Sequence, residues 1–237
     1  MMTKHLFLRT FMMLVLLVST PLLTNAQSIG FGADFYNRYI WRGYDFGDSF
    51  SVQPGLAFTA GGFELGTWGS YSISADGAGA NEHDLYATYS FNLGSTTNLA
   101  LTVTDYYFPT DSDWLNFDGD GEGAHWIELM GALTLPESFP VTLSAAFMVH
   151  NDPDNPLYLE GALPFSIGDV ELGLTLGVVA GMSDFYGVES TSLVNMGLSA
   201  SKDLQITEQF SLPLSAAYVM NPTTEKTYLV FGFSLSP

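Results

Sequence analysis

The sequence has 237 residues, of which 47% are hydrophobic and only 13% are charged, and 25 acidic residues outnumber six basic ones to give a net charge of -19. An ordinary soluble domain carries about 25% charged residues, so the composition disfavours a typical soluble surface. A chain this acidic excludes nucleic acid as a partner, because binding to phosphates requires clustered lysine and arginine. The sequence contains no cysteine, which excludes disulfides and leaves strand pairing and packing to supply the stability.

Residues 1–26 have the pattern of a secretory signal peptide. Lys4 and Arg9 precede an apolar run from Phe11 to Val18, and Thr24-Asn25-Ala26 forms a small-x-small cleavage pattern. The alternative is a membrane anchor, but the apolar run is short for a helical span of about 20 residues. After cleavage, four basic residues face 25 acidic ones, so the exported chain has a net charge of -21.

The rest of the chain, residues 27–237, shows apolar and polar residues in alternation, which indicates strands with two unlike faces in a single domain. This pattern predicts about twelve strands, each near the 9–11 residues that a tilted strand needs to cross a bilayer. Twelve is an even number, as in bacterial single-chain barrels. The expected ranges are 29–42, 50–60, 62–74, 83–93, 97–108, 124–135, 141–150, 157–167, 170–182, 191–201, 210–220 and 226–235.

The connections between these strands alternate in length. Odd connections are long and acidic, for example TDSDWLNFDGDGEG, whereas even ones are mostly short, such as GG at 61–62 and GD at 168–169. The connection around KDLQITEQ is longer than its class predicts. Long loops outside and tight turns in the periplasm are typical of outer-membrane barrels. The sequence therefore predicts an all-β fold, a transmembrane antiparallel up-and-down β-barrel.

The alternation also fits a water-soluble sandwich or a lipocalin-like barrel, so the composition of the two faces has to decide. A soluble surface is normally rich in both signs of charge, but the expected polar face is mostly Gly, Ser, Thr and Ala with scattered acids. The uniformly large apolar face is better placed against lipid, where barrel closure satisfies every backbone group. Aromatic belts are expected near the headgroups. The expected members are Tyr39, Trp41, Tyr71, Tyr107 and Tyr218 near the long loops, and Phe31, Phe58, Phe63, Phe91, Phe165, Phe210 and Phe233 near the short turns.

With the apolar face outward, strand parity turns a set of charged side chains into the lumen. We expect Arg38 to tether facing carboxylates across the lumen, and Arg42 to anchor the first outer loop near the mouth, because guanidinium binds carboxylate in a bidentate way. The alternative is that both arginines project into water. The expected lumen charges are Asp34, Arg38, Arg42, Glu64, Asp84, Glu128, Glu160 and Glu171.

A twelve-stranded barrel is intermediate between small barrels filled by side chains and the 16-stranded water channels, so a narrow lumen is expected. Its excess of carboxylates favours cations over anions. We therefore expect a passive channel for small solutes in the bacterial outer membrane. Its expected partners are outer-membrane lipid, the barrel-assembly and periplasmic chaperone machinery, and small solutes. The alternative is a non-conducting structural or adhesin-like barrel with acidic surface loops.

The longest loop carries NFDGDGEG, in which Asp118, Asp120 and Glu122 alternate with glycines. Such carboxylates suit a hard cation, so Ca²⁺ within 116–123 is a candidate ligand. The segment is not a complete EF-hand, because Leu129 stands where the bidentate glutamate is required. A solvated acidic loop without a cofactor is the favoured interpretation.

Enzymatic activity is not expected. An acyl hydrolase needs a nucleophile, a base and an orienting group near the rim of the barrel. The histidines that could serve as the base are His83, His125 and His150, and no serine accompanies them in strand register. We therefore predict no catalytic residues.

The segment from Asp34 to Tyr71 carries three motifs, namely the aromatic-x-Arg-Gly turn Ile40-Trp41-Arg42-Gly43, the pair Gln53-Pro54, and Gly66-Thr67-Trp68-Gly69. With these motifs the chain resembles the TorF-like family of candidate porins, which are bacterial proteins of unknown function. The match covers roughly the first quarter of the exported chain. The resemblance implies an outer-membrane barrel that acts as a pore, without an established substrate.

Overall fold

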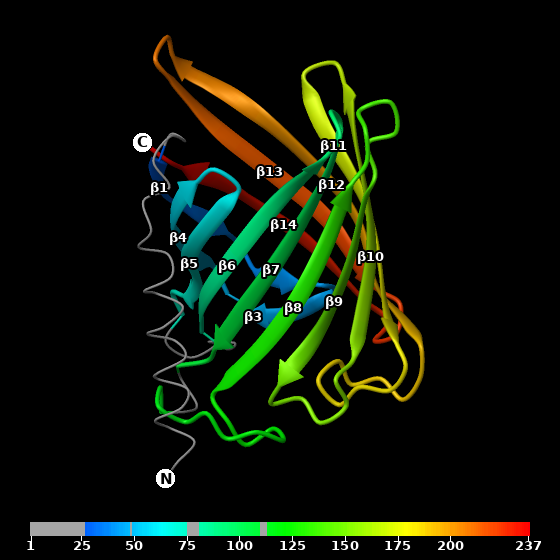
Figure 1. The fold of residues 1–237 in the computed structure, drawn as a ribbon. Coiled ribbons are helices and arrows are strands. Elements are labelled where there is room, and N and C mark those ends of the chain that lie inside the picture. Colours follow the sequence, from blue (N-terminus) through cyan, green and yellow to red (C-terminus); the bar gives the residue numbers. More distant parts are fainter. Residues whose placement is uncertain (1–26, 48, 75–80, 110–112) are drawn as a thin grey trace.

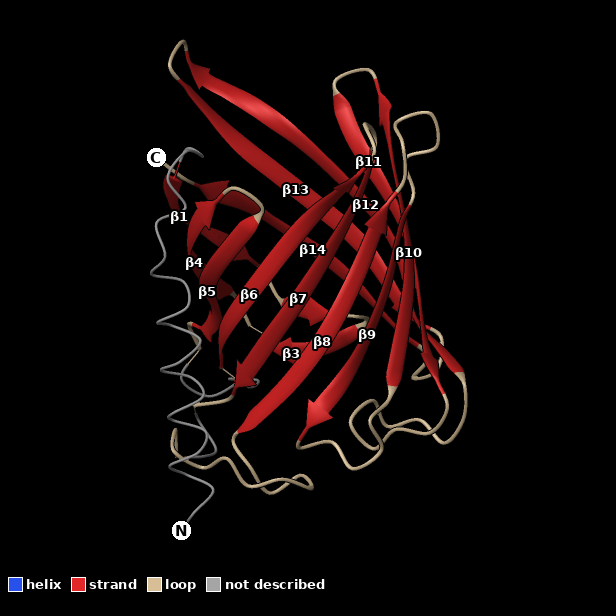
Figure 2. Ribbon diagram, in the orientation of Figure 1, coloured by secondary structure: helices blue, strands red, loops and turns tan. Residues whose placement is uncertain are grey.

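The computed structural model describes residues 27–47, 49–74, 81–109 and 113–237, and the predicted signal peptide lies outside them. The described chain is all strand and loop, as Figure 2 shows. None of these residues forms a helix long and apolar enough to cross a membrane. Twelve strands pair in the order β1-β14-β13-β12-β11-β10-β9-β8-β7-β6-β5-β4 and close on themselves, so the predicted twelve-stranded antiparallel barrel is confirmed.

The barrel is a meander in which each strand pairs with its neighbours in sequence, and β1 closes it by pairing with β14. Long loops gather at one end and tight turns at the other, at the bottom and top of Figure 1. The barrel strands are β1 Gln27–Tyr36, β4 Ser51–Ala60, β5 Phe63–Ser72, β6 Glu82–Leu93, β7 Thr97–Tyr107, β8 His125–Thr134, β9 Thr142–His150, β10 Leu157–Ile167, β11 Val170–Ala180, β12 Ser192–Thr207, β13 Phe210–Asn221 and β14 Lys226–Leu235.

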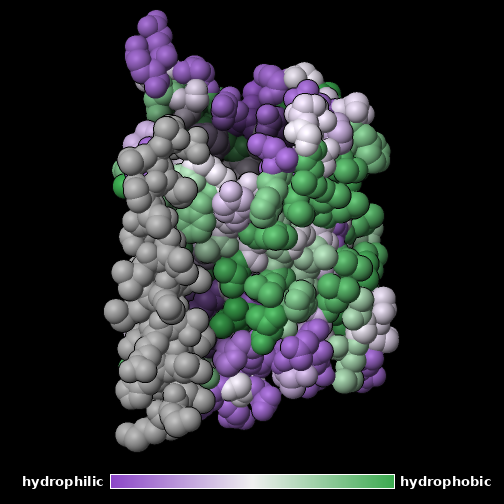
Figure 3. All heavy atoms as spheres, viewed as in Figure 1, coloured by the Kyte–Doolittle hydropathy of each residue, from purple (hydrophilic) through white to green (hydrophobic). Residues whose placement is uncertain are grey.

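The outer wall of the barrel is apolar. Large side chains that alternate with the lumen-facing residues are exposed on it, among them Leu56, Leu65, Leu101, Leu143, Leu159, Leu163, Leu174, Leu176, Leu214 and Phe231. Figure 3 shows an apolar band around the middle of the visible wall, with polar residues at both ends. An apolar face of this extent is far larger than a soluble monomer normally exposes. The distribution is that of a barrel whose solvent is lipid.

The first predicted strand, 29–42, is confirmed as far as Tyr36 and wrong beyond it. The barrel strand β1 ends at Tyr36, and the chain turns inward to form a separate hairpin of β2 (Tyr39–Trp41) and β3 (Tyr44–Gly47). Asn37 ends the strand, because its side chain takes over the pairing with β14. Its amide donates to the Leu229 carbonyl at 3.0 Å and accepts from the Phe231 backbone N–H at 2.8 Å. Figure 1 shows this hairpin inside the barrel.

Because the hairpin lies inside, two members of the predicted aromatic belt are wrong. Tyr39 is only 7% exposed and packs on Trp68, and Trp41 packs on Tyr106 within the lumen. The prediction placed both side chains on the lipid face because it continued the two-residue alternation of β1 through residue 42. The turn at Asn37 interrupts that alternation. Other expected members do lie exposed on the wall, including Tyr71, Tyr218, Phe31, Phe91, Phe165 and Phe210.

The connection around KDLQITEQ is short in the structure, because β12 is longer than predicted. The strand continues to Thr207 rather than stopping at 201, so the turn to β13 contains only Glu208 and Gln209. The connection is therefore a tight turn like the others of its class. Polar residues at the end of the strand look like a loop in sequence, although they extend the β12–β13 pairing beyond the apolar band.

Candidate functional site: the lumen and its hairpin

The inner hairpin reverses direction at Arg42-Gly43, between the paired residues Trp41 and Tyr44. Both turn residues have positive φ, 48° at Arg42 and 84° at Gly43, which is the pattern of a type I′ turn. A side chain at Gly43 would have its Cβ 2.0 Å from the Val194 carbonyl oxygen, so the tip of the hairpin lies directly against β12. The hairpin therefore crosses the lumen from β1 to β12.

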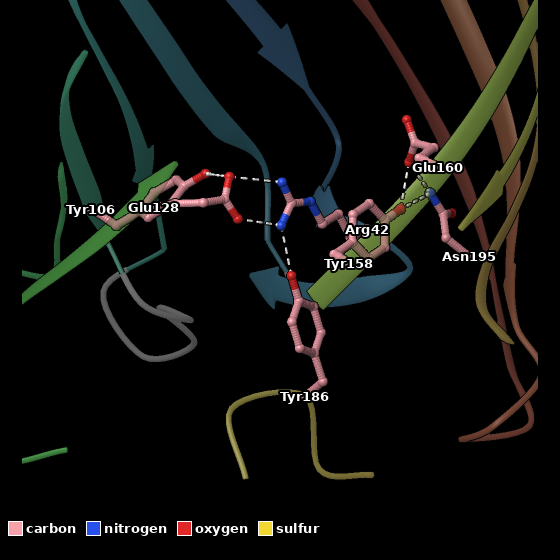
Figure 4. Close-up of polar contacts among 7 residues, drawn as sticks. All are labelled: Arg42, Tyr106, Glu128, Tyr158, Glu160, Tyr186 and Asn195. Carbon is pink, nitrogen blue, oxygen red and sulfur yellow. Dashed lines mark hydrogen bonds and ion pairs between the residues drawn. The ribbon is translucent and has the colours of Figure 1, made fainter. Parts of the chain in front are cut away.

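Arg42 ties this hairpin to the opposite wall. Its Nη1 and Nη2 donate to the two carboxylate oxygens of Glu128 on β8, at 2.5 and 2.9 Å, and Figure 4 shows the two groups aligned in parallel. The Tyr106 hydroxyl donates a third hydrogen bond to Glu128, at 3.1 Å. The side chains of Arg42 and Glu128 are only 10% and 2% exposed. A bidentate, buried pair of this kind fixes position as well as charge.

Aromatic rings surround the guanidinium of Arg42. It lies 4.3 Å from the centroid of Trp41 and 4.2 Å from that of Tyr158, distances typical of cation–π contacts. Tyr186 accepts a hydrogen bond from Arg42 Nη1 at 2.6 Å, and its ring stacks parallel to Trp41. The Tyr44 hydroxyl donates to the Tyr186 carbonyl at 2.5 Å. These contacts bring the loop between β11 and β12 inward against the hairpin.

Burial makes the phenol of Tyr186 a weaker acid. Tyr186 is 3% exposed, and burial raises the pKa of its phenol above the usual value. The phenol is therefore neutral at physiological pH, and its hydroxyl proton remains available to donate while its oxygen accepts from Arg42. Tyr186 thus links Arg42 to the β11–β12 loop without adding a charge to the lumen.

A second polar group lies beside this cluster on β10 and β12. Glu160 accepts a hydrogen bond from the Tyr158 hydroxyl and another from Asn195 Nδ2, the latter at 3.2 Å. Tyr158 also contacts the Arg42 guanidinium, as Figure 4 shows. Two of the predicted carboxylates, Glu128 and Glu160, therefore lie on either side of Arg42.

Arg38 has a different partner from the one expected. Its Nη1 lies 3.1 Å from Asp45 Oδ2 on β3, so the pair closes within the hairpin rather than across the lumen. The guanidinium also lies 5.6 Å from the ring centroid of Tyr228 on β14. The structure thus exchanges the two predicted roles, since Arg42 joins the hairpin to the far wall and Arg38 holds the hairpin strands together.

A third contact fixes the base of the hairpin. The Tyr39 hydroxyl donates to Glu82 Oε1 on β6 at 3.2 Å, and Asp84 lies two residues further along the same face. Glu82 and Asp84 are 3% and 6% exposed. The predicted lumen position of Asp84 therefore places it beneath the hairpin, covered from solvent.

The remaining predicted carboxylates are Asp34, Glu64 and Glu171. Glu64 and Glu171 lie next to short turns, two and two residues from Gly62 and Asp169, and Asp34 pairs with Ser234 near the end of β14. Within the described residues no ion pair joins any of the three to a basic side chain. Glu64 and Glu171 lie toward the short-turn end, whereas Asp34 also pairs with Gln53, two residues from the start of β4, and so lies nearer the hairpin.

The hairpin fills the lumen unevenly. Toward β5–β10 it makes dense aromatic and ionic contacts, whereas two cavities of about 450 and 140 Å³ remain toward β11–β14. Both cavities are lined by Ile40, Ser199, Ala217 and Val219, so they adjoin. The wall here carries small residues, which leave this space open.

The acidic loop does not gather its carboxylates. Asp118, Asp120 and Glu122 are all exposed, and Asp120 has a φ of 56° in a turn. Asn151 holds the loop by accepting from the backbone N–H groups of Gly121 and Gly123 at 2.8 and 3.1 Å. In the described part of the chain, no three histidine or acidic side chains lie together as metal ligands.

Two of the three candidate histidines, His83 and His125, have hydrogen-bond partners in the described structure, whereas the buried Nε2 of His150 has none. His125 is 1% exposed and stacks on Phe117 at 3.9 Å, so it holds the long loop against the barrel wall. Its Nδ1 contacts the Asp105 carboxylate at 2.9 Å and its Nε2 contacts the Trp114 carbonyl at 2.7 Å. Both ring nitrogens are thereby occupied, which leaves neither to accept a proton from a nucleophile. His83 Nε2 lies 3.0 Å from the Thr67 hydroxyl.

Sequence reasoning missed several residues of the lumen cluster. Glu82 and Tyr106 share the lumen-facing parity of Asp84 and Glu128. Glu82 lies one residue before the predicted strand 83–93, whereas Tyr106 lies within the predicted strand 97–108, where its parity indicated the lumen. Asp45 and Tyr186 lie in segments that looked like outer loops, and their sequence offers no signal that they fold inward.

The described barrel, closed by twelve strands and narrowed by an inner hairpin, has the fold of an outer-membrane porin. One similar structure is that of the KdgM porin, with 13% identity, a TM-score of 0.53, and coverage of 89% of this chain and 99% of that one. The KdgM porin in complex with disordered oligogalacturonate gives 12% identity and the same TM-score and coverage. The outer membrane protein OprD from Pseudomonas aeruginosa gives a TM-score of 0.37 at 14% identity, over 88% of this chain and 66% of that one.

The chain belongs to the Gcw_chp family, described as a bacterial protein of unknown function, whose model matches residues 25–232. No curated protein matches the sequence. The family match agrees with the expected bacterial family of unknown function, and the TorF-like designation stays a prediction.

Proposed function

We propose that the protein is a porin of the bacterial outer membrane that forms a narrow passive channel for small solutes. The observation that carries this proposal is a closed barrel with an apolar outer wall and a lumen that retains open space beside the hairpin. The porin fold supports it. Export by a cleaved signal peptide at 1–26, and insertion by the barrel-assembly and chaperone machinery, belong to the same proposal. Single-channel recording tests it, because discrete conductance steps support a pore and their absence supports a structural or adhesin-like barrel.

The proposed channel prefers cations. Within the described residues, Asp34, Glu64 and Glu171 form no ion pair with a basic side chain, and rings of carboxylates favour cations. A polyanion such as the oligogalacturonate bound to the KdgM porin does not suit this lumen, because the two arginines of the hairpin are both paired with carboxylates.

The cation preference gives a direct test. Under a salt gradient across a planar bilayer, the reversal potential is expected to have the sign of cation selectivity. The triple variant Asp34→Asn, Glu64→Gln, Glu171→Gln should lower the cation-to-anion permeability ratio, because it removes the unpaired charges. A wild-type reversal potential of the opposite sign would contradict the proposal.

The proposed function is that of a channel and not of an enzyme. The occupied nitrogens of His125 support this proposal.

We propose that residues 116–123 form a solvated acidic loop, and the alternation of Asp118, Asp120 and Glu122 with glycines supports the alternative, a calcium site. We expect calorimetric titration of the folded barrel with calcium to give at most weak heat, because the three carboxylates are exposed and apart. Tight binding that disappears in Asp118→Asn, Asp120→Asn would instead establish a site.

A further inference from the structure

The two ion pairs of the hairpin differ in how far they are exposed to solutes in the lumen. Arg42 and Glu128 are 10% and 2% exposed and enclosed by aromatic rings, so little of their charge is accessible to a solute, although Arg42 lines the smaller cavity. Arg38 and Asp45 are 30% and 19% exposed. The second pair therefore presents more of its charge to the open part of the lumen.

Arg38 also lies on the space that the hairpin leaves open. The larger cavity, about 450 Å³, is lined by Arg38 together with Tyr36, Gln53, Ser199, Ser201 and Ser215. These are small or hydrogen-bonding side chains of β1, β4, β12 and β13. On the opposite side of the hairpin, Tyr39 packs on Trp68 and Trp41 on Tyr106, which closes that route.

We infer that solutes pass the hairpin on the side of β12–β14, and that the Arg38–Asp45 pair keeps the charge along this passage balanced. This inference rests on the proposed pore function. Each charge of the pair offsets the other, so the intact pair lets small polar solutes pass with little discrimination at this level. The carboxylates Asp34, Glu64 and Glu171 then set the overall preference for cations.

Removing one member of the pair should therefore shift selectivity in a direction set by the member that remains. Asp45→Asn leaves Arg38 unpaired and is expected to lower the cation-to-anion permeability ratio about fivefold. At 1.4 kcal/mol per tenfold this corresponds to about 1 kcal/mol, the interaction of two unit charges about 4 Å apart in water. Arg38→Gln leaves Asp45 unpaired and should raise the ratio by a similar factor. Asn at position 45 keeps the oxygen that accepts from the Gly47 backbone N–H.

Asp169→Asn is the matched control, because Asp169 forms a comparable pair with Lys202, at 2.8 Å, on an exposed turn away from the hairpin. The control should shift the reversal potential less than either hairpin variant does, because neither Asp169 nor Lys202 lines the two cavities. Opposite shifts in the two hairpin variants support the inference. A conducting wild-type protein whose selectivity is unaltered in both variants overturns it while leaving the pore intact, and a wild-type protein that never conducts overturns the pore function as well.

A separate experiment tests on which side of the hairpin solutes pass. Because the protein has no native cysteine, an introduced cysteine is the single target of a thiol reagent. Ser199 lines both cavities, so modification of the Ser199→Cys variant with a charged thiol reagent should reduce its single-channel conductance by more than half. Leu214→Cys on the neighbouring β13 faces outward and should give no change. Unaltered conductance after complete labelling of Ser199→Cys places the passage elsewhere and overturns the inference.

Discussion

Replacing Arg42 with glutamine is expected to destabilise the barrel and to raise its conductance. The substitution leaves Glu128, 2% exposed, as a buried carboxylate without its cation, and breaking such a pair costs about 3–5 kcal/mol. It also removes the link from the hairpin to Tyr186 and to the ring of Tyr158. Urea unfolding in detergent micelles measures the stability, and single-channel recording measures the conductance.

Two controls separate the loss of the pair from a general loss of structure. Arg38→Gln removes the same charge from a more exposed pair, for which about 0–1 kcal/mol is typical. The double variant Arg42→Gln, Glu128→Gln removes the unpaired charge and should recover part of the stability, as a double-mutant cycle measures. Equal unfolding midpoints for Arg42→Gln and Arg38→Gln would show that the buried pair has no special role.

Deleting the inner hairpin is expected to widen the pore without opening the barrel. Strand β1 pairs directly with β4 along Gln27–Tyr36, so closure does not depend on the hairpin. A variant in which a short Gly-Ser linker replaces Arg38–Gly47 should retain the heat-modifiable gel mobility of a folded barrel. Its single-channel conductance should rise severalfold, and liposome swelling should admit larger sugars.

Deleting Asp118–Glu122 is the matched control for the hairpin deletion. This segment is part of an exposed loop whose Phe117 stacks on the outward-facing His125, so its loss should leave conductance unchanged. If the hairpin deletion folds and conducts like the wild type, the hairpin does not form the constriction.

The barrel follows from the sequence because its cause is local and repeated. Alternation in each strand places residues such as Leu174 and Leu214 on one face, and the same face is apolar in every strand, so small errors at strand ends do not alter the outcome. Strand parity likewise placed Glu128 and Glu160 in the lumen, where the structure has them hydrogen-bonded beside Arg42. These are properties that each strand carries by itself.

The inward hairpin could not be read from the pattern. Residues 34–47 continue the alternation of β1 and resemble a strand followed by an outer loop, and the interruption depends on Asn37 bonding to β14, about 190 residues later in the chain. The same holds for Tyr186, whose loop folds inward only because Trp41, Arg42 and Tyr44 provide partners there.

The sequence by itself therefore determined an acidic, cysteine-free chain that closes as a twelve-stranded barrel with an apolar outer wall, because periodicity and composition act within each strand. Only the tertiary structure decided which arginine pairs with which carboxylate, and on which side of the lumen space remains. Those features arise from contacts between segments far apart in the chain, and a bidentate pair such as Arg42–Glu128 requires the closed barrel that places β8 opposite the hairpin.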